Sequence, residues 1–194
     1  MKKLLLKIAG AAAILAVVLV IAAWMALRAS LPQLDGELVV AGIASPVTIQ
    51  RDAEGIPAIT ASNRQDLAYA TGFVHGQDRF FQMDLIRRQA AGEFSALFGA
   101  AAIDADKRNR FHRFRSRAQA VWENTPRAEQ AIMEAYTAGV NAGLASLDAR
   151  PWEYLVLRIE PQPWQPQDSL LVMYSMYMTL NDERASNEVR RGLA

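Results

Sequence analysis

The sequence of 194 residues has no cysteine and only two histidines, His75 and His112. The lack of cysteine excludes disulfide frameworks, thiolate metal sites and a cysteine nucleophile from these residues. Two isolated histidines are too few for a histidine-rich metal site, so we expect both to be structural or solvent-exposed. Asp104 and Asp106 lack the later ligands and the glycine of a calcium loop, so we expect a solvated acidic pair.

The standard catalytic signatures are also missing. There is no G-x-S-x-G elbow, no H-E-x-x-H pair, no P-loop and no G-x-G-x-x-G turn. No repeat with a period of 20–50 residues is present either, which argues against a solenoid.

Acidic residues are absent from the first 28 positions, which hold four cations: Lys2, Lys3, Lys7 and Arg28. The other 166 residues carry 17 basic and 20 acidic side chains, a net charge of −3. The excess positive charge therefore belongs to the N-terminal segment. This argues against nucleic-acid binding, which requires a basic footprint on the folded domain.

Charge is absent altogether from Ile8 to Leu27, twenty nearly all apolar residues. A helix of that length spans about 30 Å, the thickness of a bilayer's hydrocarbon core. Lysines before it predict a cytoplasmic N-terminus. The segment is a signal anchor or a cleaved signal peptide, and the poor A-x-A match at residues 26–30 favours the anchor. Both interpretations predict a periplasmic or extracytoplasmic body, with residues 8–27 as the possible anchor in the cytoplasmic membrane.

We divide the chain into residues 1–28, the signal anchor or signal peptide, 29–45, a linker and first extended segment, and 46–194, the body. Alternating residues from Val47 to Arg51, a turn at 52–55 and a second extended run at 56–61 predict a hairpin.

Three helices are expected in the body. The first begins with a capping box at Ser62 and Gln65 and ends at Gly92. The second begins with Thr125 as its cap and Pro126 in its first helical position. The third runs from about Pro166 to Leu180, with Asp168 in its first turn; residues 104–117 form a connector or short helix, and 151–166 an irregular packed loop.

The stretch GFVHGQDRFFQMDLIRR, residues 72–88, has aromatic side chains around most of a helix. Polar residues interrupt its middle: Gln77, Asp78, Arg79 and Gln82. Asp78 with Gln82, and Asp84 with Arg88, are one turn apart, which predicts local pairs within a buried helix. The alternative is a solvated stripe, with Arg87 and Arg88 extending to the surface.

Four segments, in order, carry a resemblance: VTIQRDAEGIPAITA, GFVHGQDRFFQMDLIRRQAAGEFSALFG, AYTAGVNAGLASL and PQPWQPQDSLL. Together they resemble the α-chain region of the penicillin acylase family of N-terminal-nucleophile hydrolases. The resemblance implies an α+β fold, here the largely helical α-chain portion of an αββα sandwich that the chain's own β chain completes. It also implies an incomplete α region, a fragment of a longer exported precursor.

Family members cleave acyl amides by acyl transfer to the N-terminal serine of the β chain, which autocatalytic cleavage exposes. The resemblance therefore implies a hydrolase of penicillin-like or N-acyl-homoserine-lactone-like substrates. It assigns no catalytic residue and no organic cofactor to this chain, and we expect the fragment alone to be inactive. A non-catalytic, membrane-anchored binding or interaction module is the alternative, because these residues hold no catalytic constellation.

By position, the resemblance places a structural calcium ligand at Glu188 and acyl-pocket residues at Met178, Asn181 and Asp182. Asn181 and Asp182 depart from the arginine–aromatic pair of the best-known penicillin acylases, which leaves acyl groups other than phenylacetyl open. From the residues alone, the carboxylates after Leu180 have a second interpretation, a solvated helix end.

Overall fold

The computed structural model describes residues 2–180 and 192. Within them the chain is largely helical, with one two-stranded antiparallel sheet. The elements are α1 (Lys2–Ala29), β1 (Thr48–Arg51), β2 (Pro57–Thr60), α2 (Arg64–Ala91), α3 (Ser95–Phe98), η1 (Gly99–Ala102), α4 (Ile103–Arg110), α5 (Phe114–Asn124), α6 (Arg127–Ala145), α7 (Trp152–Leu157) and α8 (Asp168–Leu180). The expected helical content and the hairpin are confirmed.

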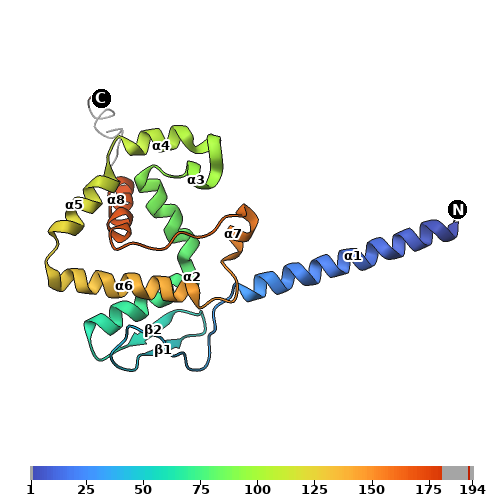
Figure 1. Ribbon diagram of the computed structural model, residues 1–194, viewed down its shortest axis with the longest axis horizontal. Coiled ribbons are helices and arrows are strands. Elements are labelled where there is room, and N and C mark those ends of the chain that lie inside the picture. The colour runs from blue at the N-terminus through green and yellow to red at the C-terminus, as the bar shows by residue number, and fades with distance from the viewer. Residues whose placement is uncertain (1, 181–191, 193–194) are drawn as a thin grey trace.

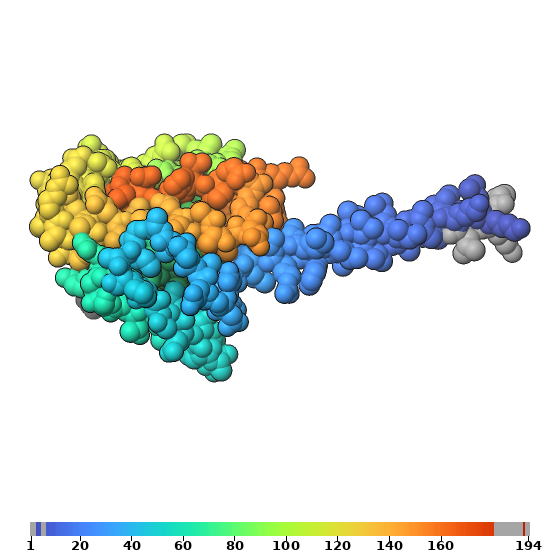
Figure 2. Space-filling view, turned by 60° about the horizontal axis from the view of Figure 1, so that its bottom comes forward, coloured from blue at the N-terminus to red at the C-terminus, as the bar shows by residue number. Residues whose placement is uncertain are grey.

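The N-terminal apolar segment is a helix that projects away from the body, as Figures 1 and 2 show. Its stretch from Lys7 to Ala29 is long and apolar enough to cross a membrane, and the body buries none of it. After it, residues 30–47 cross the surface of the body without regular secondary structure and lead into β1.

The long helix α2 runs through the middle of the body (Figure 1). It packs along α6 and, nearer its C-terminal end, against α8. Two clusters of buried side chains lie along this axis. One contains Phe80, Val140, Tyr154 and Trp164, and the other contains Ala90, Ala91, Phe114, Ala118 and Leu171.

The start of α2 differs by one residue from the expected capping box. Asn63, rather than Ser62, is the N-cap, and its side-chain oxygen accepts a hydrogen bond from the Asp66 backbone N–H at 2.8 Å. The Asp66 carboxylate accepts hydrogen bonds from the backbone N–H groups of Ala44 and Ser45, at 2.8 and 3.0 Å. It thereby fastens the segment after α1 to α2. These donors, that of Ala44 foremost, hold the pKa of Asp66 below its ordinary value.

The expected end of α2 at Gly92 is confirmed. Gly92 adopts the left-handed conformation, with φ of 70°, and its N–H bonds to the carbonyls of the last turn. Asp106, expected to be solvated, is instead buried and accepts the N–H groups of Phe94 and Ser95. Its neighbour in the pair, Asp104, is exposed as expected.

Two connections are more ordered than the sequence indicated. Residues 104–117 include most of α4 and the start of α5, which residues 111–113 separate, and the φ of Arg113 is 55°. Residues 151–166 include the short helix α7. Thr125 is the C-cap of α5 and donates its hydroxyl hydrogen to Val121, so Pro126 rather than Thr125 precedes α6 as its N-cap.

Candidate functional site

The expected pocket residue Met178 lies on the last turn and a half of α8. It is partly buried and packs against the cluster that contains Ala90, Phe114 and Leu171. The other expected site residues, Asn181, Asp182 and Glu188, lie outside the described residues. The structure therefore places one of the four, at the point where α8 leaves the core.

A small cavity of about 90 Å³ adjoins Met178. Its lining consists of Gln89, Ala90, Asn109, Phe114, Ser175, Met178 and Thr179. Sites for drug-sized ligands usually measure about 300–1,000 Å³. The cavity is therefore large enough for the end of an acyl group, and a complete substrate pocket requires further walls.

Aromatic stacking fixes one side of this cavity. The Phe114 ring stacks on Tyr174 of α8, with centroids 4.7 Å apart, and on His112, at 5.1 Å. These parallel rings join α5 to α8 beside Met178. His112 therefore has a structural role, in agreement with the sequence-based expectation.

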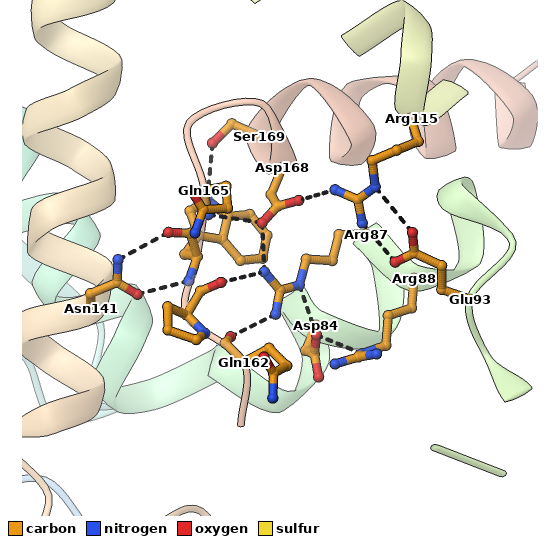
Figure 3. A network of polar contacts seen from close by, with 12 residues as sticks. Asp84, Arg87, Arg88, Glu93, Arg115, Asn141, Gln162, Gln165, Asp168 and Ser169 are labelled. Carbon is orange, nitrogen blue, oxygen red and sulfur yellow. Dashed lines mark hydrogen bonds and ion pairs between the residues drawn. The ribbon is translucent and has the colours of Figure 1, made fainter. Parts of the chain in front are cut away.

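A buried ionic network holds the other end of α8 in place (Figure 3). Asp168, in the first turn of α8, is 1% exposed and accepts hydrogen bonds from three groups. They are Nη1 of Arg87 at 2.5 Å, Nη1 of Arg115 at 2.6 Å and the Gln165 backbone N–H at 2.8 Å. One carboxylate thus connects α2, α5 and the start of α8.

The same network satisfies Asp84, which is fully buried. Its Oδ1 accepts from Nε of Arg87 at 2.7 Å and Nε of Arg88 at 2.8 Å, and its Oδ2 accepts from the Tyr154 hydroxyl at 2.7 Å. Burial, with the adjacent Asp84 charge, raises the pKa of Tyr154. The expected Asp84–Arg88 pair is confirmed, and the alternative in which Arg87 and Arg88 extend to the surface is wrong.

Arg87 makes most of the remaining contacts. It donates to the carbonyls of Gln162 and Pro163 at 2.7 and 3.0 Å, and its guanidinium lies 4.9 Å from the centre of the Trp164 ring. The loop before α8 is therefore held from within. The sequence showed the arginine but not these carbonyls, which lie 75 and 76 residues further along the chain.

The network is balanced in charge, which limits its chemistry. Three carboxylates face three guanidinium groups: Asp84, Glu93 and Asp168 face Arg87, Arg88 and Arg115. Burial opposes a rise in the pKa of Arg115, but the hydrogen bonds that its guanidinium donates to Glu93 and Asp168 raise that pKa. Carboxylates so fully occupied by cations are poor general bases and poor metal ligands, so the network positions α8.

The polar residues earlier in α2 lie outside this network. Asp78 pairs with Arg51 of β1, at 2.8 and 3.1 Å, and thereby joins the hairpin to α2. Gln77 donates to the Ser146 hydroxyl, and Arg79 is exposed. His75 bonds to the Tyr136 hydroxyl at 2.9 Å, and partial burial lowers the pKa of His75.

No group of three or more histidine, cysteine or acidic side chains able to hold a metal ion occurs in the described part of the chain. Another cavity, of about 760 Å³ and larger than the one beside Met178, lies between residues 33–51 and α2. Tyr69, Phe73 and Val74 of α2 are among its lining residues.

Comparison with known proteins gives consistent results. Residues 46–194 match the family model described as penicillin amidase. Penicillin acylase 2 proenzyme from Pseudomonas sp. (strain SE83) is 45% identical over 148 residues, which cover 76% of this chain and 19% of that protein. Acyl-homoserine lactone acylase QuiP from Pseudomonas aeruginosa is 33% identical over 162 residues, covering 81% and 19%.

Among solved structures, a thermostable penicillin G acylase from Alcaligenes faecalis superposes with a TM-score of 0.63 at 25% identity. The match covers 76% of this chain and 81% of that chain. This chain spans about a fifth of the length of the curated relatives it matches. The solved acylase chain is thus much shorter than those curated relatives.

Proposed function

Because the chain belongs to the penicillin amidase family, we propose that it is the α-chain region of an exported amide hydrolase precursor. The continuous match over residues 46–194 is the observation that carries this proposal. Two relatives of this chain are an acylase proenzyme and an acylase, both of which are named for hydrolysis of acyl amides.

Maturation into two chains is part of the proposal. A 45% identical relative is named a proenzyme. A solved relative has a chain of which this sequence covers four-fifths, although the curated relatives are about five times longer than the matched region. Both facts support a separate α chain that pairs with its own β chain and completes the αββα sandwich with it.

The proposed chemistry is acyl transfer to the N-terminal serine of that β chain. A free α-amine has a pKa of about 7.7–8.0, so near neutral pH it can accept the proton of the serine hydroxyl. No histidine is required for this step. The α chain contributes shape: the ionic network fixes α8, and α8 presents Met178 to the acyl side of the pocket.

Substrate choice follows from the acyl-side residues. Met178, Asn181 and Asp182 line the proposed pocket, and a thioether adapts to irregular apolar groups. This chain lacks the arginine–aromatic pair of phenylacetyl-selective relatives. The proposed pocket therefore accepts the fatty acyl group of an N-acyl-homoserine lactone. The small cavity beside Met178 supports an acyl terminus at this point.

The decisive experiment is expression of the complete gene product in a bacterium. Two chains after purification, together with hydrolysis of penicillin G or an N-acyl-homoserine lactone, would support the proposal. A single unprocessed chain without hydrolysis of any acyl amide would favour the alternative, a membrane-anchored binding module. The 760 Å³ cavity against α2 would then be the first place to look for a ligand.

A structural calcium ion held in part by Glu188 is also proposed. Residues 2–180 contain no group of three or more histidine, cysteine or acidic side chains that could hold the ion without Glu188. Glu188→Ala should lower the calcium content and the melting temperature of the purified enzyme. Glu54→Ala, an exposed glutamate in the hairpin turn, is the control. Unchanged calcium on elemental analysis would refute the assignment.

A further inference from the structure

The apolar helix α1 meets the body without a spacer. The Ala149 backbone N–H, in the connection between α6 and α7, donates to the Ala29 carbonyl at 2.9 Å. Ser30 is buried, and its hydroxyl donates to the Leu27 carbonyl at 2.7 Å. The last turn of α1 is therefore capped and attached to the folded body.

The length of α1 sets where the body would lie relative to a bilayer. At 1.5 Å per residue, the 23 residues from Lys7 to Ala29 span about 34 Å, against about 30 Å for the hydrocarbon core. A span that starts at Ile8 ends near Leu27. Arg28 lies over the Trp24 ring at 5.5 Å, and both residue types suit the interface. The body thus begins within one turn of the hydrocarbon edge.

Exposed apolar side chains lie on the segments that follow this junction in the chain. They are Leu31 and Leu34 on the segment after α1, and Trp152 and Val156 on α7. Figure 1 shows α7 at the end of the body from which α1 projects. Trp152 follows Ala149 by three residues, so it lies within about 11 Å of the hydrogen bond that attaches α1.

We propose that α1 is retained in the mature enzyme as a transmembrane anchor, and that Leu31, Leu34, Trp152 and Val156 form a membrane-contact surface. The surface rests in the headgroup region of the lipid bilayer. This inference builds on the export proposed above and decides between the two fates of the N-terminal helix.

Two observations support retention over cleavage. Residues 26–29 are helical, and residues 27–30 are hydrogen-bonded to one another and to Ala149, so α1 continues into the folded body without an extended segment between them. The same residues match the small-residue cleavage pattern poorly. Retention holds the acylase body against a bilayer, where amphiphilic acyl amides concentrate.

The contact is apolar rather than electrostatic. Asp35 and Glu37 are exposed in the segment after α1, and Arg158 is exposed at the end of α7. Because these charges are of mixed sign, attraction to anionic lipid contributes little. Binding should therefore persist in about 1 M salt, at which the Debye length falls to about 3 Å.

Retention is tested on the complete precursor, expressed in a bacterium and fractionated. The N-terminal peptide of the α chain is identified by mass spectrometry after an alkaline carbonate wash of the membranes. Recovery of residues 8–29 on a membrane-bound α chain supports the proposal. An α chain that starts beyond residue 25 in the soluble fraction overturns it. Amide hydrolysis, measured separately in detergent, tests the proposed function and is independent of this result.

The contact surface is tested with a polarity-sensitive dye on Val156→Cys, after replacement of any cysteine elsewhere in the precursor. Val121→Cys on α5, at the far end of the body, is the matched control. In vesicles of phosphatidylethanolamine and phosphatidylglycerol, headgroup-labelled quencher lipids should quench the dye at 156 but not at 121. Equal quenching at both sites, or none at 156, overturns the surface.

Discussion

Gly76 of α2 lies directly against the backbone of Val140 on α6. A Cβ added at Gly76 would be 2.1 Å from the Val140 carbonyl oxygen, well inside van der Waals contact. Three more glycines make equivalent contacts between the two helices: Gly72, Gly139 and Gly143. Each helix thus has two glycines, four residues apart, that lie against the backbone of the other helix. This close approach fixes the position of α2 relative to α6.

A methyl group at this contact should separate the helices. For Gly139→Ala, the new Cβ would be 1.9 Å from the Tyr69 carbonyl oxygen, and we expect a loss of about 3 kcal/mol in the free energy of unfolding. In an exposed helix the same substitution is usually stabilising. Thermal unfolding of the complete enzyme measures the change.

The control for this prediction is Ala138→Ser, which adds one atom on the exposed side of the same helix. Its melting temperature should stay near that of the wild type. If Gly139→Ala melts like the control, α2 and α6 are not in backbone contact.

The Asp168 carboxylate should be the most sensitive polar group of the network. Asp168→Asn leaves Arg87 buried without its second carboxylate, and breaking a buried ion pair typically costs about 3–5 kcal/mol. Denaturant unfolding should show this loss. Asp104→Asn, whose partner Lys107 is exposed, should change stability by less than about 0.5 kcal/mol.

The stability contributed by Asp66 should depend on pH. Its pKa is lower in the folded protein, so its contribution is complete above the ordinary carboxyl pKa and disappears as the pH falls through the lowered value. Wild type should therefore exceed Asp66→Asn in stability at pH 7, and this difference should begin to shrink once the pH falls below about 4.

Asp35→Asn is the control for that comparison, because Asp35 is exposed and lies in the segment that also contains Ala44 and Ser45. If the difference in the free energy of unfolding between wild type and Asp66→Asn stays constant from pH 7 to pH 3, the charge of the carboxylate does not strengthen its hydrogen bonds to Ala44 and Ser45.

The sequence predicted elements better than it predicted their contacts. Local signals predicted the hairpin, the end of α2 at Gly92 and the position of α8, because turn and cap preferences act within a few residues. The Asp84–Arg88 pair was foreseeable from its helical spacing. The bonds from Arg87 to Gln162, Pro163 and Asp168 were not, since partners 75 to 81 residues away leave no periodic trace. The glycine pairs were visible in the sequence, and their four-residue spacing could have indicated a close helix contact.

Met178 should govern the length of the acyl group that the mature enzyme accepts. Met178→Ala enlarges the 90 Å³ cavity at its wall, so the preference should shift toward longer acyl chains. One methylene in an apolar pocket is worth about 1–3 kcal/mol, so we expect a change of about 10-fold or more in the ratio of kcat/KM for long over short N-acyl-homoserine lactones. Met173→Ala, an exposed methionine on the same helix, should leave this ratio unchanged. Because Met178 also packs on the core cluster, a loss of melting temperature with an unaltered ratio would show that the residue supports α8 without touching the substrate.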